Sequence, residues 1–258
     1  MQQSYALITG SSGGIGLEMA RIAATKKYNL ILTARSTDKL EEIKKELSVT
    51  YGIKVICIPL DLSLQQCADK LYRTVKESSI IPEILINNAG FGYHGNFYKT
   101  SWEKENDMLN LNIIALTHLT KLFIQDMIHE GHGMVMNVSS TAAFLPLPYL
   151  SVYAASKSYV LSFSEALHAE LKGTGISVTT LCPGPTKTGF EKKAEFENAN
   201  LFNKFPVATA KKVAQKGFDG MLKKKTLVIP GGFNKLNYIS SIITPRFITK
   251  RIAKKIMQ

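Results

Sequence analysis

Short apolar runs alternate with amphipathic segments along most of the chain. The apolar runs predict strands at 5–9, 29–34, 54–62, 83–87, 134–138, 176–181 and 226–230. Apolar residues at three- and four-residue spacing predict helices at 14–27, 38–48, 66–78, 101–128, 153–172 and 207–224. Strands that are apolar throughout are typical of a sheet buried on both faces. The pattern therefore predicts an α/β, Rossmann-type fold, in which helices cover both faces of a doubly wound parallel sheet of about seven strands.

Length and composition fit one domain followed by a short extension. The chain has 258 residues, of which 45% are hydrophobic and 20% are charged, so it can bury a sizeable core. No internal repeat or linker-like segment divides it. We expect a single domain over 1–232, with a possible substrate lid at about 189–206, and a basic amphipathic appendage over 233–258.

The cysteines and the N-terminus favour a cytoplasmic protein. Cys57, Cys67 and Cys182 are too widely spaced for a zinc site or a disulfide framework, which suits a reduced compartment. The chain enters its first apolar run at Tyr5 without a secretory signal. Apolar stretches also stay short of the ~18 to 20 residues that span a bilayer.

The net charge of +12 is concentrated near the C-terminus. The segment 223–258 carries nine Lys or Arg residues and no Asp or Glu, which leaves +3 for the first 222 residues. This distribution argues against a nucleic-acid-binding surface. The tail is amphipathic and interrupted by Pro245. Three interpretations stay open for it: packing on the body of the protein, attachment to an anionic membrane surface, or an oligomer arm.

A glycine-rich turn, TGSSGGIG at 9–16, follows the first predicted strand and opens the first helix. Its glycines permit a tight turn and close approach of backbone to a pyrophosphate, which the helix N-terminus would bind. This context predicts a dinucleotide site. After the second strand, Arg35 stands where NAD sites usually carry a carboxylate, so NADP is favoured over NAD. The alternative is that Arg35 is an ordinary solvated side chain.

Two further strand ends carry polar residues. Asp61 follows the third strand and could accept a hydrogen bond from an adenine amino group, or Asp61 or Ser63 could cap the next helix. The sequence NNAG at 87–90 ends the fourth strand. Its small residues leave room for a flat ring, and its Asn side chains can tie neighbouring strand ends together.

Tyr153 and Lys157 are four residues apart at the start of a predicted helix, so they share a face. An ammonium beside a phenol favours the phenolate and lowers its pKa from about 10. Such a tyrosine can carry a proton in carbonyl and alcohol chemistry. Ser140 lies thirteen residues upstream, at the end of a predicted strand. Ser139 competes for the same role, although the spacing and the strand alternation favour Ser140.

With these motifs in place, the chain resembles the short-chain dehydrogenase/reductase family. TGSSGGIG, NNAG, YAASK at 153–157 and Pro183-Gly184 match the family's motifs in order. Asn112 matches the fourth member of its catalytic set. The resemblance implies an NADP(H)-dependent oxidoreductase that interconverts a carbonyl and an alcohol.

The resemblance also implies a role for each catalytic residue. Tyr153 would be the general acid and base, and Lys157 would lower its pKa and hold the nicotinamide ribose. Ser140 would donate to the substrate oxygen. Asn112 would position a water that connects Lys157 to solvent. No metal is implied, and the five histidines (His94, His118, His129, His132 and His168) are too dispersed to form a ligand cluster.

The same resemblance assigns the cofactor-binding residues to the turns that follow the strands. They are Gly10, Ser11, Ser12, Gly14, Ile15, Gly16, Arg35, Asp61, Leu62, Asn88, Ala89, Gly90, Tyr153, Lys157, Pro183, Gly184, Thr186 and Thr188.

Partners and substrate are less constrained. In relatives the helices equivalent to 101–128 and 153–172 often form a dimer interface, so a homodimer or homotetramer is expected. Leu116, Leu119, Leu122 and Phe123 suit an apolar contact face. The segment 189–206 fits either a lid over an apolar substrate or a surface helix. Two rival functions remain: a membrane-surface reductase of lipophilic or acyl substrates, and a dinucleotide-binding sensor without turnover.

Overall fold

The computed structural model describes residues 4–189 and 206–245, together with Thr249 and Ala253. Within these residues, seven strands form one sheet in the order β3-β2-β1-β4-β5-β6-β9, and every pairing in it is parallel. The strands are β1 (Tyr5–Thr9), β2 (Asn29–Ala34), β3 (Val55–Pro59), β4 (Ile84–Asn87), β5 (Gly133–Val138), β6 (Ile176–Leu181) and β9 (Leu227–Val228). The predicted doubly wound, Rossmann-type sheet is confirmed.

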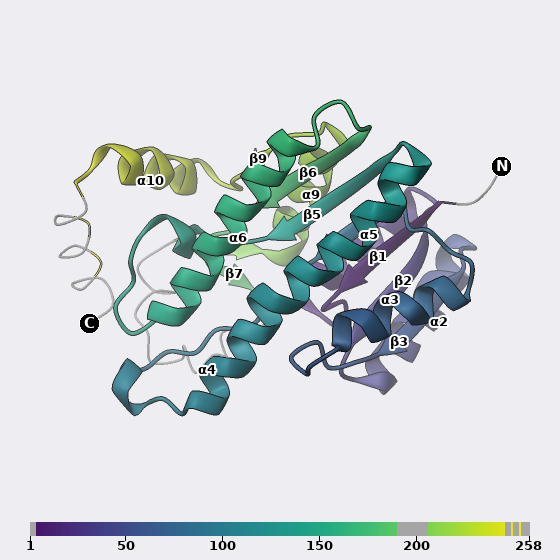
Figure 1. The fold of residues 1–258 in the computed structure, drawn as a ribbon, viewed down its shortest axis with the longest axis horizontal. Coiled ribbons are helices and arrows are strands. Elements are labelled where there is room, and N and C mark those ends of the chain that lie inside the picture. The colour runs from purple at the N-terminus through teal and green to yellow at the C-terminus, as the bar shows by residue number, and fades with distance from the viewer. Residues whose placement is uncertain (1–3, 190–205, 246–248, 250–252, 254–258) are drawn as a thin grey trace.

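Helices cover both faces of the sheet (Figure 1). They are α1 (Gly14–Thr25), α2 (Thr37–Tyr51), α3 (Cys67–Glu77), α4 (Trp102–Leu109), α5 (Leu116–Glu130), α6 (Ser151–Glu170), α9 (Ala210–Leu222) and α10 (Gly232–Ile243). Two short 3₁₀ helices, η1 (Phe97–Lys99) and η3 (Thr141–Phe144), lie in the loops.

Side-chain alternation along the strands builds two hydrophobic cores. Ile8 of β1 packs with residues of α1, α2 and α9 on one face, including Met19 and Phe218. Leu7, its neighbour, packs with α3 and α5 on the other face, where Phe123 is fully buried. Because successive strand residues point to opposite faces, a strand that is apolar at every position fills both cores.

Strand order creates a crevice at one edge of the sheet. β1 pairs with β2 on one side and with β4 on the other, so the chain winds outward in both directions from this point. The connections that leave the carboxyl ends of β1 and β4 therefore run to opposite faces. In open α/β sheets ligands bind at such a switch point.

Buried polar side chains join the strand ends around this crevice. The Thr9 hydroxyl oxygen accepts hydrogen bonds from the backbone N–H groups of Asn88 and Ala89, each at 2.9 Å. The Asn87 amide donates to the side-chain oxygens of Thr120 and Asn137, also at 2.9 Å. The expectation that the asparagines tie neighbouring strand ends together is confirmed.

The predicted helix 101–128 is interrupted in the structure. α4 and α5 are joined by a π-helical segment, η2 (Asn110–Ala115), in which the turns are wider than in an α-helix. Within this segment Asn112 is fully buried, and its side chain bonds to the backbone of Phe91. Apolar spacing alone does not reveal a π-helical turn.

The prediction that four apolar residues of the helix 101–128 form a dimer contact face is wrong for three of them. Leu116, Leu119 and Phe123 are buried against the sheet of their own chain. Their helical spacing is therefore explained by the core.

A small second sheet and a shortened last strand were not predicted. β7 (Thr186–Lys187) pairs in parallel with β8 (Ala208–Thr209), and two-residue strands are too short for periodicity to detect. The last strand, β9, covers only two residues of the predicted 226–230, and Pro230, which lacks an N–H group, follows shortly after it.

The Thr9 hydroxyl offers a test of the strand-end contacts. We expect Thr9→Val to lower the free energy of unfolding by about 2 to 3 kcal/mol, because two partly buried N–H donors lose their acceptor. Thr9→Ser retains the hydroxyl and should stay closer to the wild type in urea denaturation. Equal losses in the two variants would contradict this account.

Candidate active site

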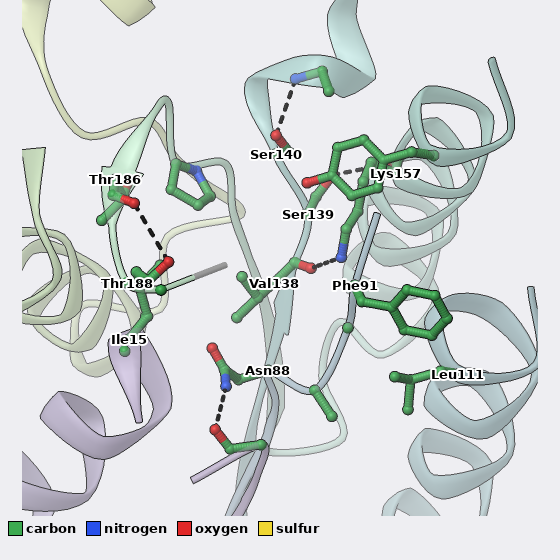
Figure 2. A pocket seen from close by; sticks show the side chains of 18 of the residues that line it. Ile15, Asn88, Phe91, Leu111, Val138, Ser139, Ser140, Lys157, Thr186 and Thr188 are labelled. Carbon is green, nitrogen blue, oxygen red and sulfur yellow. Dashed lines mark hydrogen bonds between the residues drawn. The ribbon is translucent and has the colours of Figure 1, made fainter. Parts of the chain in front are cut away.

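A cavity of about 660 Å³ opens along the carboxyl ends of the parallel strands. Its walls come from the loops that follow β1, β2, β3, β4, β5 and β6, and Figure 2 shows side chains from several of them around one space. Most of the predicted site residues line it: Gly10, Ser12, Gly14, Ile15, Arg35, Asp61, Leu62, Asn88, Ala89, Gly90, Ser140, Tyr153, Lys157, Pro183, Gly184, Thr186 and Thr188.

Three predicted residues lie behind the cavity wall. Ser11 is fully buried, and its hydroxyl is directed to the carbonyl oxygen of Thr33 at 3.4 Å. A Cβ atom on Gly16 would collide with the carbonyl oxygen of Gly10, so glycine allows α1 to start close to β1. Asn112 is also fully buried. These residues shape the site without facing its interior.

Ser140 and Tyr153 meet at one end of the cavity. Ser140 follows β5 directly, and its side-chain oxygen caps η3 by accepting from the backbone N–H of Ala142 at 3.1 Å. Tyr153 lies in the first turn of α6, with its ring against Gly92, where a Cβ would approach the ring to 2.9 Å. Burial raises the pKa of Tyr153, and a hydrogen bond between the two hydroxyls partly opposes this increase.

The geometry distinguishes Ser140 from its neighbour. Ser139 is buried, and its hydroxyl donates to the backbone carbonyl oxygen of Lys157 at 2.7 Å. That bond ties β5 to α6. Ser140, which points the other way along the strand, is the serine that reaches the Tyr153 phenol.

Lys157 does not pair with the phenol as the four-residue spacing predicted. Its Nζ atom donates to the carbonyl oxygen of Val138 at 3.0 Å (Figure 2) and lies 5.9 Å from the centroid of the Tyr153 ring. Burial lowers the pKa of Lys157 to about 8 and raises the pKa of Tyr153 to about 12. The expected lowering of the phenol pKa by the ammonium is therefore absent from this arrangement.

Asn112 joins the loop after β4 to the helix that carries Tyr153. Its side chain accepts from the N–H of Phe91 at 3.2 Å and donates to the Phe91 carbonyl at 2.9 Å. It also donates to the Ser156 hydroxyl, which donates in turn to the Tyr153 backbone carbonyl. A Cβ on Gly90 would lie 2.9 Å from Asn112 Oδ1 and 3.2 Å from Lys157 Nζ, so both polar side chains crowd one glycine.

The far end of the cavity carries charged side chains. Arg35 is largely exposed and lies 3.8 Å from a carboxylate oxygen of Asp61. The other Asp61 oxygen accepts from the N–H and hydroxyl of Ser63. The N-cap position of α3 is occupied by Gln66, so the alternative role of Asp61 or Ser63 as its cap is wrong.

Several cavity residues escaped the sequence analysis. Lys39 lines the same end as Arg35, from the first turn of α2. Its position four residues after Arg35 was the sequence feature that could have identified it.

At the opposite end the wall of the cavity is apolar, and most of it comes from the loop FLPLPYL at 144–150. The apolar residues of this loop, which lie outside any predicted element, were the sequence feature that could have identified it. The apolar lining comprises Phe91, Leu111, Phe144, Leu145, Leu147 and Leu150. Most of the expected lid, 190–205, lies outside the described residues.

The glycine-rich turn fits a dinucleotide. Gly10 and Gly14 have φ angles of 64° and 57°, in the left-handed region that side chains disfavour. A Cβ on Gly14 would also come within 3.0 Å of Thr188, so a side chain there would narrow the passage between the turn and the β6 loop. The first N–H groups of α1 follow immediately and suit a pyrophosphate.

Comparison with known proteins identifies the class. A sequence model described as short chain dehydrogenase matches residues 4–199. The chain therefore belongs to the short-chain dehydrogenase family.

Among curated relatives, the chain is 31% identical to a very-long-chain 3-oxoacyl-CoA reductase of Rattus norvegicus over 183 residues. This match covers 69% of the chain and only 58% of the relative, so the chain spans less than two thirds of the length of that protein. A ketoacyl reductase of Nostoc sp. is 30% identical over 86% of the chain and 77% of its own length.

A solved short-chain dehydrogenase from Sphingobium yanoikuyae in complex with NADPH is also similar. It is 26% identical, with a TM-score of 0.85, over 99% of this chain and 97% of its own. Another solved structure, a 7beta-hydroxysteroid dehydrogenase, is 22% identical with a TM-score of 0.87 and supports the fold alone.

The buried Lys157 predicts how stability depends on pH. Its pKa falls from 10.5 to about 8 on folding, so below pH 8 the penalty for burying the ammonium is fully present. Above that value the unfolded state binds more protons, and stability rises with pH. Above pH 10 the raised pKa of Tyr153 has the opposite effect, because the unfolded phenol ionises first.

We therefore expect the free energy of unfolding of the wild type to rise by about 2 kcal/mol between pH 8 and 10, relative to Lys157→Met. Urea denaturation of both proteins across this range measures the difference. Parallel pH curves for the two proteins would show that Lys157 is not buried as an ammonium.

Proposed function

We propose that this protein is an NADP(H)-dependent oxidoreductase that interconverts a carbonyl and an alcohol by hydride transfer. The observation that carries the proposal is the convergence of Ser140, Tyr153 and Lys157 at one end of a cavity whose other end begins at the glycine-rich turn. Proton-transfer groups and a dinucleotide cradle in one cavity are what such a reaction requires.

Each polar group of the site has its own role in the proposed reaction. In the reductive direction Tyr153 donates a proton to the carbonyl oxygen, and Ser140 donates a hydrogen bond that stabilises the negative charge developing there. When bound, the nicotinamide supplies or accepts the hydride. Burial raises the pKa of Tyr153 to about 12, so the phenol is protonated at neutral pH and can donate its proton to the developing alkoxide.

NADP is the proposed cofactor because two cations border the adenosine end of the cavity. Arg35, just before α2, and Lys39, in its first turn, both line it, and Arg35 lies 3.8 Å from a carboxylate oxygen of Asp61. A 2′-phosphate would bind such a pair through charge-assisted hydrogen bonds. The similar Sphingobium yanoikuyae enzyme was solved with NADPH, which supports the assignment.

The apolar wall suggests the class of substrate. Leucine and phenylalanine side chains of the 144–150 loop, together with Phe91 and Leu111, surround the space beside Tyr153. Such a wall would desolvate an alkyl chain on the substrate. The reductases of 3-oxoacyl-CoA and ketoacyl compounds among the relatives support a lipophilic ketone or 3-oxoacyl group.

A homodimer through α4, α5 and α6 remains our proposal for assembly. Trp102 of α4, Ile114 of the connecting segment η2 and Tyr159 of α6 are exposed, with 68%, 60% and 38% of their surface accessible. Tyr159 also stacks on Phe163 within α6, at 5.8 Å between ring centroids. Exposed aromatic side chains of this kind are enriched at interfaces.

A dinucleotide sensor without turnover is the rival function. It would need the glycine-rich turn and Arg35, but it would not need Ser140 hydrogen-bonded to a phenol inside an apolar recess. The catalytic interpretation therefore explains more of the site.

Two adjacent serines provide a matched test of the mechanism. We expect Ser140→Ala and Tyr153→Phe each to lower kcat for NADPH-dependent reduction of a 3-oxoacyl thioester by about 10²- to 10⁴-fold. Ser139→Ala removes only a hydroxyl that bonds the Lys157 carbonyl and should retain most activity. The assay is NADPH oxidation followed at saturating substrate. Equal losses at Ser139 and Ser140 would contradict the assignment.

Cofactor choice is tested at Arg35. We expect Arg35→Ala to raise KM for NADPH by about 10- to 100-fold, the equivalent of one charge-assisted contact, and to leave KM for NADH nearly unchanged. Lys39→Ala should act in the same direction. Steady-state kinetics with both cofactors measures the ratio, and a parallel change for NADPH and NADH would show that neither side chain binds the 2′-phosphate.

A further inference from the structure

The helix α10 has its apolar side on the outside. Its half-buried positions, which face the protein, are polar or amphipathic: Asn234, Asn237, Tyr238 and Ser241. Its exposed positions are largely apolar and recur at three- and four-residue spacing: Phe233, Leu236, Ile239, Ile242 and Ile243, from 43% to 75% accessible. A helix that packs on a protein core normally has the opposite distribution.

Contacts with the active site hold α10 in this orientation. The Tyr238 ring packs on Phe144 of η3, at 4.7 Å between centroids. The Asn234 side chain donates to the Pro230 carbonyl at 2.6 Å and lies directly against Gly184 of the β6 loop. Asn234 and Asn237 also line the cavity. The inner face is therefore fixed by the site, and the outer face is not free to turn inward.

The sequence on and after α10 is strongly basic. Lys235 is exposed on the helix itself, and the segment 246–258 that follows it carries five Lys or Arg residues and no Asp or Glu. In sequence, 223–258 has nine basic residues and no acidic one. A second copy of the chain on this face would bring two basic segments together, and their charges would repel each other. A neutral apolar partner would leave the basic residues without counter-charges. A surface that is both apolar and anionic matches the exposed apolar side chains and the basic residues together.

We propose that α10 docks the protein on the surface of an anionic lipid bilayer. Leu236, Ile239 and their apolar neighbours enter the boundary between headgroups and acyl chains, while Lys235 binds the lipid phosphates. Among the described residues, no helix is long and apolar enough to cross a membrane. Figure 1 shows α10 at the periphery of the molecule, away from the central sheet.

The docking also places the cavity at the lipid. Asn234 and Asn237 line the cavity on one side of α10, and the apolar residues face outward on the other. The cavity and the outward-facing apolar side chains are separated by one helix diameter, about 10 Å. If the proposed function holds, the docking brings a lipophilic substrate in the bilayer close to the cavity that Tyr153 lines.

Vesicle co-sedimentation of the full chain tests the docking. The vesicles contain phosphatidylcholine alone or phosphatidylcholine mixed with phosphatidylserine. We expect the wild type to bind the mixed vesicles, and Leu236→Ser/Ile239→Ser to lower the partition coefficient about tenfold or more. These substitutions leave the net charge unchanged. Val49→Ser, at an exposed apolar position on α2, is the control and should bind like the wild type.

Three results would overturn the proposal. They are no sedimentation of the wild type with mixed vesicles, equal binding by Leu236→Ser/Ile239→Ser, and a dimer in sedimentation velocity that the double variant abolishes without any vesicle binding. NADPH oxidation with a water-soluble ketone, measured in parallel, separates this proposal from the enzymatic one. Activity without vesicle binding would contradict only the docking proposal. Vesicle binding without activity against any carbonyl would contradict only the enzymatic proposal.

Discussion

The polar contacts between the carboxyl ends of β1, β4 and β5 are the constraint on which the rest of the site depends. Thr9, Asn87 and Asn88 are held by hydrogen bonds to neighbouring strands, so the strand ends meet without filling the space above them with apolar side chains. Buried polar groups are costly unless they are paired. Here the hydrogen bonds between strand ends fix three loops around one crevice. The residues of those loops then determine which ligand the crevice binds.

The same logic operates at the proton-transfer end of the cavity. Asn112, buried by a π-helical turn, fastens the loop after β4, and Ser139 fastens α6 to β5. Ser140 and Tyr153 are thereby held face to face, while Lys157 is buried beside Val138 with a lowered pKa. Burial therefore favours the uncharged forms of both groups, the neutral amine and the neutral phenol.

Much of this fold was predictable from the sequence, because apolar periodicity reports burial directly. The strands and most helices follow from it, and the strand-end motifs TGSSGGIG and NNAG locate the crevice. Contacts that depend on three-dimensional packing were not predictable. Spacing placed Lys157 beside the phenol of Tyr153, but its amine bonds to Val138, and Leu119, which seemed free for a partner, is core. The contact of α10 with the cavity likewise depends on the fold.

The central claim is that the crevice holds a nicotinamide beside Tyr153 for hydride transfer to a carbonyl. The most direct test is a single-turnover reaction with NADPH carrying deuterium at either face of carbon 4, a 3-oxoacyl thioester as substrate, and mass spectrometry of the product. The account predicts that deuterium from one face only appears on the new alcohol carbon. Stable NADPH binding without transfer from either face, across substrates of different chain length, would contradict it.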